Sequence, residues 1–382
     1  MLSTQFLQSK NPPQHHQSQL DLQTLFLSLS GLNLTNDSST SQNVININDT
    51  GILAACLFPS AQNVVFGHSS FFRQNQGQID LPTPEQIRQE AARLSLSQNQ
   101  AGVTHVPIPS LKLLVKYGPT VTSTEAKNQL LLRRLLPKDV PVLEVFGWRK
   151  DADDTFIYMS LPESGIPLSD AWPLLSEDQK TEITTQLRQV VRSWRRLRQN
   201  NSTRTRVESI DQTPLHDTIF TPTPSTTTKP GPFPDVPTFH TWFVQTAMSP
   251  PPSTSHTHLP SSSFHFQPNA FFQDKTPILF THASLHPSNI LISTTTPNPS
   301  ILAILDWSQA GWYPAYWEFC KARRACNVGS GSNIAALRDW EGTYMPWILD
   351  DEKVGIKKWG GTVLCHYWDY FVGLFERRAA SS

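Results

Sequence analysis

The sequence predicts an α+β fold, with a small β-rich part followed by a larger, mainly helical part. Between residues 111 and 162, three short apolar segments bounded by Pro, Gly or Asp alternate with one helical segment. From residue 177 onward, long segments with apolar residues at helical spacing dominate. At 382 residues, the chain is long enough to build a sizeable core in each part.

Residues 1–79 are rich in Gln, Ser and Asn, a composition that buries too little apolar surface to form a core. We predict that most of this segment is a disordered extension. Order is expected from residue 80, because Thr83 and the proline after it form a good helix start. Apolar residues then follow at helical spacing as far as residue 96.

The first predicted domain spans residues 80–162. Its strand candidates are 111–118, 140–148 and 154–162, and a helix is predicted over 122–136 between the first two. This strand, helix, strand, strand order is typical of a mixed layer rather than of an all-helical domain.

The second predicted domain spans residues 163–378. It opens on a long helix at 177–199, whose apolar residues form a single stripe. Segments near 218–232 and 249–268 are rich in Pro, Ser and Thr and are predicted to be inserted loops on either side of a short helix at 239–243. The rest of the chain is predicted to be helical and aromatic as far as about Arg378.

Composition excludes several classes of partner. Lys plus Arg balances Asp plus Glu at 31 each, so nothing in the bulk charge attracts nucleic acid or an anionic membrane. The four cysteines form no CxxC pair and are predicted to be free thiols in a reducing compartment. Neither a signal peptide nor a membrane-spanning run is seen, and a cytoplasmic location is expected.

The segment THASLHPSNILIS, residues 281–293, carries the first functional signal. Apolar runs at 290–292 and 301–305 flank a turn-rich connector, which predicts a β-hairpin. Asn289, at the start of the first strand, and Asp306, after the second, should emerge at the same end of the ladder. An amide oxygen beside a carboxylate suits Mg²⁺.

Two other interpretations of this segment were considered. A hydrolase would need Ser284 in a nucleophile elbow, but no glycine flanks it. A zinc site at His282 and His286 would need a continuous helix or an HExxH pattern, and Pro287 argues against the helix.

Three pieces, FTHASLHPSNILI, ILDW and GWYPAYWEFCKA, occur in this order and resemble the aminoglycoside phosphotransferase family, especially its fungal branch. LPTPEQIR, LLVKYG and TSTEA extend the resemblance over roughly residues 80–375. The resemblance implies a two-lobed protein-kinase-like fold. It also implies phosphoryl transfer from ATP, or another nucleoside triphosphate, to a small-molecule hydroxyl, with Mg²⁺ held by Asn289 and Asp306.

The resemblance also implies roles in the amino-terminal lobe. Lys116 stands where the family contacts the ATP phosphates, and Glu125 where its helix glutamate pairs with that lysine. Ser160 and Leu161 fall in the hinge that meets adenine, and the phosphate-covering loop is expected within residues 95–110. Without the resemblance, Glu125 also fits a capping box begun by Thr122, and Lys116 a half-exposed strand.

One departure from the family pattern bears on the activity. Ser284 stands where the family has its catalytic aspartate, and Ala283 where it has a glycine. A serine hydroxyl cannot accept the substrate proton at neutral pH, and loss of a general base costs about 10² to 10⁴-fold in rate. His282 or His286 is the nearest candidate to replace it.

Three interpretations follow: a phosphotransferase of reduced activity, a nucleotide-binding pseudokinase or scaffold whose insertions meet protein partners, or a degenerate chain without a ligand. The sequence does not identify the acceptor.

Overall fold

The computed structural model describes residues 45–46, 61–99, 102–162, 164–199, 205–220, 229–249, 271–293, 298–328, 340–349 and 361–380. All of them lie in one compact unit that spans Asn43–Ser382. Most of the predicted extension, residues 221–228 of the first predicted insertion and residues 250–268 of the second lie outside the described residues.

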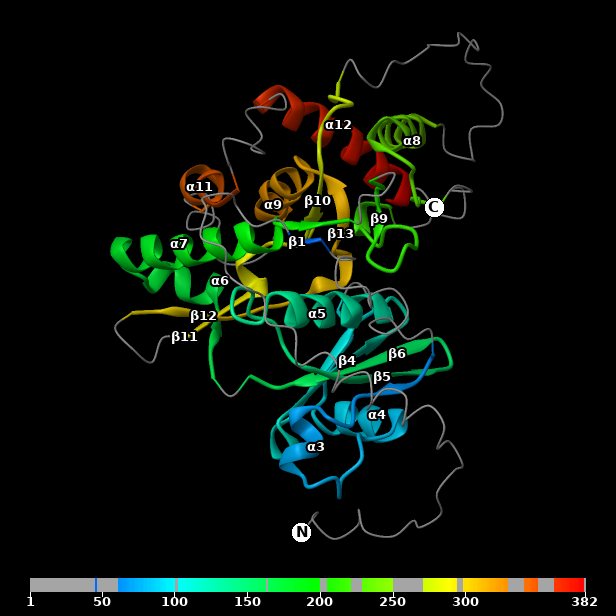
Figure 1. The fold of residues 1–382 in the computed structure, drawn as a ribbon, viewed down its shortest axis with the longest axis vertical. Coiled ribbons are helices and arrows are strands. Elements are labelled where there is room, and N and C mark those ends of the chain that lie inside the picture. The colour runs from blue at the N-terminus through cyan, green and yellow to red at the C-terminus, as the bar shows by residue number, and fades with distance from the viewer. Residues whose placement is uncertain are drawn as a thin grey trace. The chain divides into compact units, whose positions relative to one another are not determined.

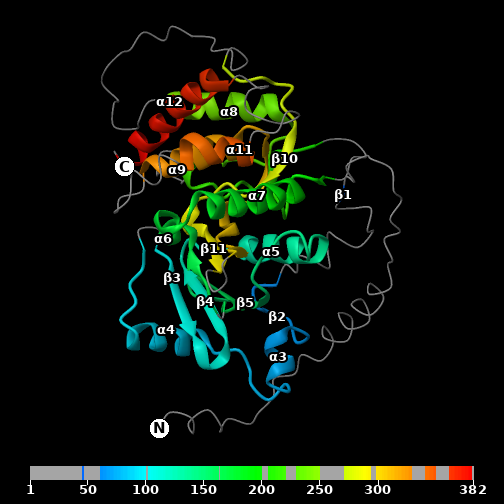
Figure 2. The same ribbon diagram turned by 90° about the vertical axis from the view of Figure 1, so that its left-hand side faces the viewer.

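The amino-terminal lobe is built on a five-stranded antiparallel sheet, parts of which are labelled in Figures 1 and 2. Its strands lie in the order β2-β5-β6-β4-β3. The strands are β2 (Val64–Val65), β3 (Thr104–Ile108), β4 (Leu113–Gly118), β5 (Val145–Asp151) and β6 (Asp154–Ser160), and a 3₁₀ turn (Pro109–Leu111) joins β3 to β4. Helix α5 (Ser123–Leu135) follows β4, so the predicted strand, helix, strand, strand order is present.

The two faces of this sheet are covered by different parts of the chain. Helices α3 (Ser70–Gln74) and α4 (Pro84–Arg93) pack on the face away from the helical lobe (Figures 1 and 2). The other face packs against α5 and against Leu291 and Ala303 of the helical lobe. The sheet therefore separates two apolar cores, one on each of its faces.

Order begins earlier than the predicted boundary at residue 80, because residues 61–79 contribute β2 and α3. β2 adds to the edge of β5, where Gly147 lets the strands approach: a Cβ at Gly147 would lie 2.3 Å from the carbonyl oxygen of Val64. Phe71 of α3 is 2% exposed and packs under the sheet. This pairing is long-range, so the composition of the segment does not reveal it.

One helix start in this lobe has the caps expected from the sequence, and another does not. At α4, Thr83 and Gln86 form a capping box, each side chain accepting from the other's backbone N–H. At α5, the side chain of Thr122 makes no capping hydrogen bond, so the alternative capping-box interpretation of Glu125 is wrong. The glutamate turns toward the sheet instead.

The helical lobe contains α6 (Leu168–Ala171), α7 (Glu177–Trp194), α8 (Val236–Met248), α9 (Trp317–Val328), α11 (Met345–Leu349) and α12 (Gly361–Ala380). Short helical turns lie at Trp172–Leu174, Thr218–Phe220, Pro287–Asn289, Trp307–Gln309 and Trp340–Tyr344. Helix α8 is longer than the predicted helix at 239–243, since Asp235 caps it by accepting from the N–H of Thr238. A core rich in Trp, Tyr and Phe joins these helices.

Three small sheets complete this lobe. β10 (Ile278–Thr281) and β9 (Glu208–Ser209) flank β13 (Gly311–Pro314), and β1 (Ile45–Asn46) pairs with β8 (Leu197–Arg198). The third sheet holds β7 (Ile166–Pro167), β11 (Ile290–Ser293) and β12 (Ser300–Ile304). β11 and β12 form the predicted antiparallel hairpin, in which Ile290 faces Ile304.

This arrangement confirms the predicted α+β fold, with a β-rich amino-terminal lobe and a larger, mainly helical carboxy-terminal lobe. In the described part of the chain, no helix has the length and apolar character needed to cross a membrane.

Candidate functional site

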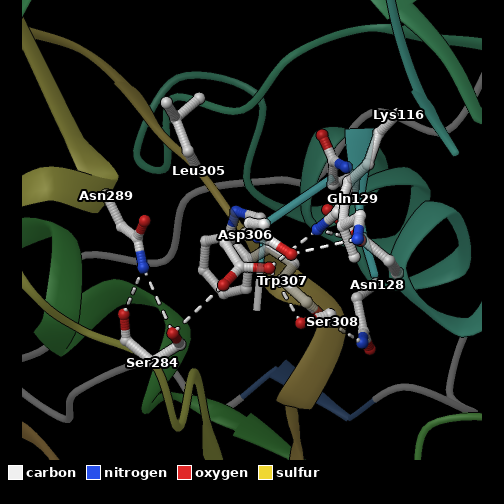
Figure 3. Close-up of polar contacts among 12 residues, drawn as sticks. Lys116, Asn128, Gln129, Ser284, Asn289, Leu305, Asp306, Trp307 and Ser308 are labelled. Atoms are coloured by element: carbon white, nitrogen blue, oxygen red, sulfur yellow. Dashed lines mark hydrogen bonds and ion pairs between the residues drawn. The ribbon is translucent and has the colours of Figure 1, made fainter. Parts of the chain in front are cut away.

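Three segments that are far apart in the sequence meet at the amino group of Lys116. Lys116 lies on β4, Glu125 in the first turn of α5, and Asp306 two residues after the end of β12. The Lys116 Nζ lies 2.7 Å from Glu125 Oε2. It also lies 2.8 Å from Asp306 Oδ1 (Figure 3). The structure thus brings together the predicted phosphate-contacting lysine, its partner glutamate and one predicted metal ligand.

The charges at this junction stabilise one another. Burial alone would lower the pKa of Lys116, but the carboxylates of Glu125 and Asp306 raise it well above its ordinary value. Burial would likewise raise the pKa of Asp306, yet the charge and hydrogen bond of Lys116 and the Ser308 hydroxyl hold it well below its usual range. The lysine is therefore protonated and Asp306 ionised at neutral pH. The Asp306 side chain remains 31% exposed, so a ligand can reach it.

The hairpin places Asn289 beside the segment that carries Asp306, as predicted: the N–H of Leu305 donates to the Asn289 carbonyl oxygen at 2.8 Å. Ser284 lies between their side chains (Figure 3). Asn289 Nδ2 donates to the Ser284 carbonyl oxygen at 2.8 Å and to Ser284 Oγ at 3.1 Å. Ser284 Oγ in turn donates to Asp306 Oδ2 at 3.2 Å. The serine hydroxyl therefore links the two predicted metal ligands.

These side chains fit a hard divalent cation by their chemistry. Asp306 offers an ionised, partly exposed carboxylate. The Asn289 amide nitrogen faces Ser284, which leaves the amide oxygen on the other side of the group (Figure 3). Carboxylate and amide oxygens are what Mg²⁺ prefers.

His282 is engaged on both ring nitrogens. Its Nδ1 accepts from the N–H of Ser284 at 3.1 Å, and its Nε2 lies 3.0 Å from the carbonyl oxygen of Leu305. A carbonyl only accepts, so Nε2 carries the proton. The side chain is fully buried, and burial lowers its pKa to about 4. The lone pair needed to accept a substrate proton is therefore already used.

The second histidine of the loop, His286, makes its hydrogen bonds to Ser288 within the same loop. The Nδ1 of His286 accepts from the N–H of Ser288 at 3.3 Å and contacts the hydroxyl of the same residue. Among the described residues, no group of three or more His, Cys, Asp or Glu side chains is placed to hold a metal ion.

Glu318 fixes the loop and was missed by the sequence analysis, which gave it no role. Its carboxylate accepts from the backbone N–H groups of His282, at 2.7 Å, and Ala283, at 3.0 Å. Ala283 is fully buried with φ +61, a conformation costly for a residue with a side chain. A lone acid inside the aromatic segment at 311–320 was the available signal, since a fully buried carboxylate needs donors.

Two more residues missed by the sequence analysis fasten α5 to the helical lobe. Asn128 Nδ2 donates to the carbonyl oxygens of Trp307, at 2.9 Å, and Ala310, at 3.2 Å. Asp211 accepts from Lys127 Nζ at 2.8 Å and from Thr124 Oγ1 at 3.2 Å. They hold the helix that carries Glu125 against the loop that carries Asp306. No local pattern marks them, because each contact spans more than 80 residues.

The backbone N–H groups at the predicted hinge are engaged. The N–H of Ser160 donates to the Glu144 carbonyl oxygen at 2.8 Å, and that of Leu161 to the Lys112 carbonyl oxygen at 2.9 Å. The role of these two residues in meeting adenine stays a prediction, and any such contact would use their carbonyl oxygens or other backbone groups.

Comparisons with known proteins give remote similarities. No family model matches the chain, and no curated protein matches it. Among solved structures, it is similar to a thermostable mutant of the aminoglycoside phosphotransferase APH(4)-Ia in a ternary complex with ADP and hygromycin B. The TM-score is 0.46 at 12% identity, over 77% of this chain and 92% of the other.

A second complex of a thermostable APH(4)-Ia mutant, with AMP-PNP and hygromycin B, gives a TM-score of 0.43 at 14% identity, over 75% and 92% of the two chains. An aminoglycoside-3'-phosphotransferase of type VIII gives 0.39 at 13% identity, over 76% and 98%. Because these TM-scores and sequence identities are low, the fold is described from the topology of this chain alone.

Proposed function

We propose that this chain is a member of the aminoglycoside phosphotransferase family, of its fungal branch, that binds ATP with Mg²⁺ and transfers its phosphoryl group to a small-molecule hydroxyl only slowly. The observation that supports this best is the meeting of Lys116, Glu125 and Asp306 from three distant segments. Buried charged groups held by specific partners cluster at functional sites, and Lys116 with its two carboxylates is such a group.

Each residue has a distinct task in this proposal. Lys116 binds phosphate oxygens, and Glu125 holds it in place. Asp306 and Asn289 would hold the magnesium ion, which when bound neutralises charge on the phosphates. Ser284 positions both of these side chains through its hydroxyl and its carbonyl oxygen.

Slow transfer follows from the loop chemistry. Neither Ser284 nor the doubly engaged His282 can accept the proton of an attacking hydroxyl. Positioning and charge neutralisation, which supply most of the acceleration in phosphoryl transfer, stay in place. A non-catalytic nucleotide-binding role is the second candidate, and the double engagement of His282 favours it, because the lone pair of this candidate replacement base is already used.

The proposal is tested by calorimetric titration of the full chain with ATP, with and without Mg²⁺. We expect Mg²⁺-dependent binding that Lys116→Ala weakens about 10-fold or more, since it removes a charge-assisted contact. Asp306→Asn should abolish the Mg²⁺ dependence. Glu376→Gln is the matched control, because it neutralises an exposed acid on α12. Absence of ATP binding, or equal binding by all variants, would refute the proposal.

A further inference from the structure

His105 lies next to the proposed phosphate site, on the neighbouring strand. β3 pairs antiparallel with β4, and in this register His105 stands directly opposite Lys116. Side chains of directly opposed residues project from the same face of a sheet, with their Cβ atoms about 5 Å apart. The imidazole therefore projects on the face where Lys116 meets Asp306.

The two side chains differ in exposure. The Lys116 side chain is 7% exposed, whereas His105 is an exposed residue. Although His105 is exposed at the surface, the surrounding protein partly shields its ring from water. This shielding and the charge of Lys116 outweigh the charge of Asp306 and hold the pKa of His105 below its ordinary value. The ring is thus close to the ion pair and on its solvent side, where a ligand of Lys116 would lie.

The position of β3 at the edge of the sheet suggests a function for the His105 side chain. Kinase-like sites cover the nucleotide phosphates with a glycine-rich loop that lies over them. Here β3 is the outermost strand of the sheet, and in the described residues before it the chain forms helix α4 and a turn, in which the N–H of Asn99 donates to the Val103 carbonyl oxygen. Within the described residues, no further strand pairs with β3 on the side away from β4.

We propose that His105 contacts the terminal phosphates of the bound nucleoside triphosphate, donating an imidazole N–H to a phosphate oxygen beside the edge strand β3. This inference rests on the proposed function and extends it to a residue that the family pattern does not assign. A neutral imidazole always carries one N–H donor, and phosphate oxygens are strong acceptors.

A series of ligands with decreasing phosphate number tests the inference on the full chain. Affinities of wild type and His105→Ala are measured by titration calorimetry for ATP, ADP, AMP and adenosine in Mg²⁺. His105→Ala should weaken ATP binding about 10-fold and leave adenosine within about 2-fold, since one charge-assisted hydrogen bond is lost. His105→Gln, which keeps an N–H donor, should recover part of the loss. His366→Ala, at an exposed position in α12, should match wild type.

The possible failures are distinguishable. If wild type binds ATP and Lys116→Ala weakens that binding, but His105→Ala matches wild type, the role of His105 is wrong and the proposed function stands. An equal loss for ATP and adenosine would also overturn it, because the contact would then not be to phosphate. If wild type binds none of the four ligands, the proposed function fails together with this inference.

Discussion

Ser284 changes the chemistry of its loop while keeping the loop connected. Its hydroxyl donates to Asp306 and accepts from Asn289, so each neighbour keeps a partner. A carboxylate at this position would lie against the ionised Asp306 at a similar distance. Two carboxylates so close repel unless a proton or a cation lies between them.

We therefore expect Ser284→Asp to lower the free energy of unfolding by roughly 1–3 kcal/mol in a chelator, because of this repulsion. Added Mg²⁺ should remove most of the loss. Urea unfolding with EDTA and with Mg²⁺ measures both effects, and Ser284→Asn is the control of equal size without charge. If both variants lose the same stability under both conditions, the two side chains do not share a cation site.

Glu318 is the residue on which the conformation of the loop depends most. Glu318→Ala would leave the backbone N–H groups of His282 and Ala283 buried without an acceptor, at about 1–3 kcal/mol each. We expect a total loss of about 3–5 kcal/mol in urea unfolding. Glu376→Ala, at an exposed acid paired with Arg324, should lose less than about 1 kcal/mol. If Glu318→Ala lowers the free energy of unfolding by less than about 1 kcal/mol, the loop keeps its conformation without the Glu318 carboxylate.

At the scale of elements, α5 belongs as much to the helical lobe as to the sheet. Asp211 fastens its first turn, and Asn128 fastens the next turn to the segment after Asp306. Both contacts are largely shielded from water: Asp211 and Lys127 have side chains 11% exposed, and Asn128 is fully buried. Glu125 is thereby set against Lys116 before any ligand arrives.

We expect Asn128→Ala to speed amide hydrogen exchange in α5 and in residues 307–311. The buried carbonyl oxygens of Trp307 and Ala310 both lose the Asn128 amide as a donor, although that of Trp307 still accepts from the N–H of Ala310. The free energy of unfolding should fall by about 2–3 kcal/mol. Gln89→Ala on α4, whose side chain only contacts Glu85 on an exposed face, is the control. Unchanged exchange in α5 would mean that the sheet alone holds this helix.

Elements with a local signal were predictable from sequence. The helix start at Thr83 and Pro84 marked α4, and the turn-rich connector marked the β11–β12 hairpin. The part of the site that follows from this hairpin, Asn289 next to the segment of Asp306, was predictable for the same reason. β2 and the true length of α8 were not: β2 exists only through pairing with β5, and α8 extends through its cap at Asp235.

The rest of the site depends on contacts between distant segments. The engagement of His282 with the Leu305 carbonyl oxygen and the contacts of Glu318 follow from packing within the helical lobe. The contact of Asn128 follows from how α5 packs against that lobe. Spacing in the sequence does not encode these contacts. Family resemblance supplied Lys116 and Glu125, which the residues alone left open.

At the scale of the whole molecule, buried histidines make stability depend on pH. His240 of α8 is fully buried between Asp274, at 3.2 Å, and the Tyr316 hydroxyl, at 2.9 Å. Burial lowers its pKa to about 4, against about 6.5 in the unfolded chain. The unfolded state therefore binds the proton first as pH falls.

The stability contributed by a neutral His240 is complete above pH 6.5 and is lost as pH falls toward 4, at about 1.4 kcal/mol per pH unit. The difference in unfolding free energy between wild type and His240→Gln should thus shrink by roughly 3 kcal/mol over this window. Urea unfolding at pH 7.5, 6, 5 and 4.5 measures it, with His366→Gln as the exposed control. If the difference in unfolding free energy does not change with pH, the His240 imidazole is exposed to water in the folded state.

We infer that the site binds ATP and Mg²⁺ but lacks the base for transfer. Phosphate release from saturating ATP with Mg²⁺ tests this inference when it is compared between wild type and the double variant Ala283→Gly, Ser284→Asp, with ATP binding measured on both. We predict comparable ATP binding and release that is about 10² to 10⁴-fold faster in the double variant, the usual contribution of a general base. Equal rates of release in two proteins that both bind ATP would contradict the inference.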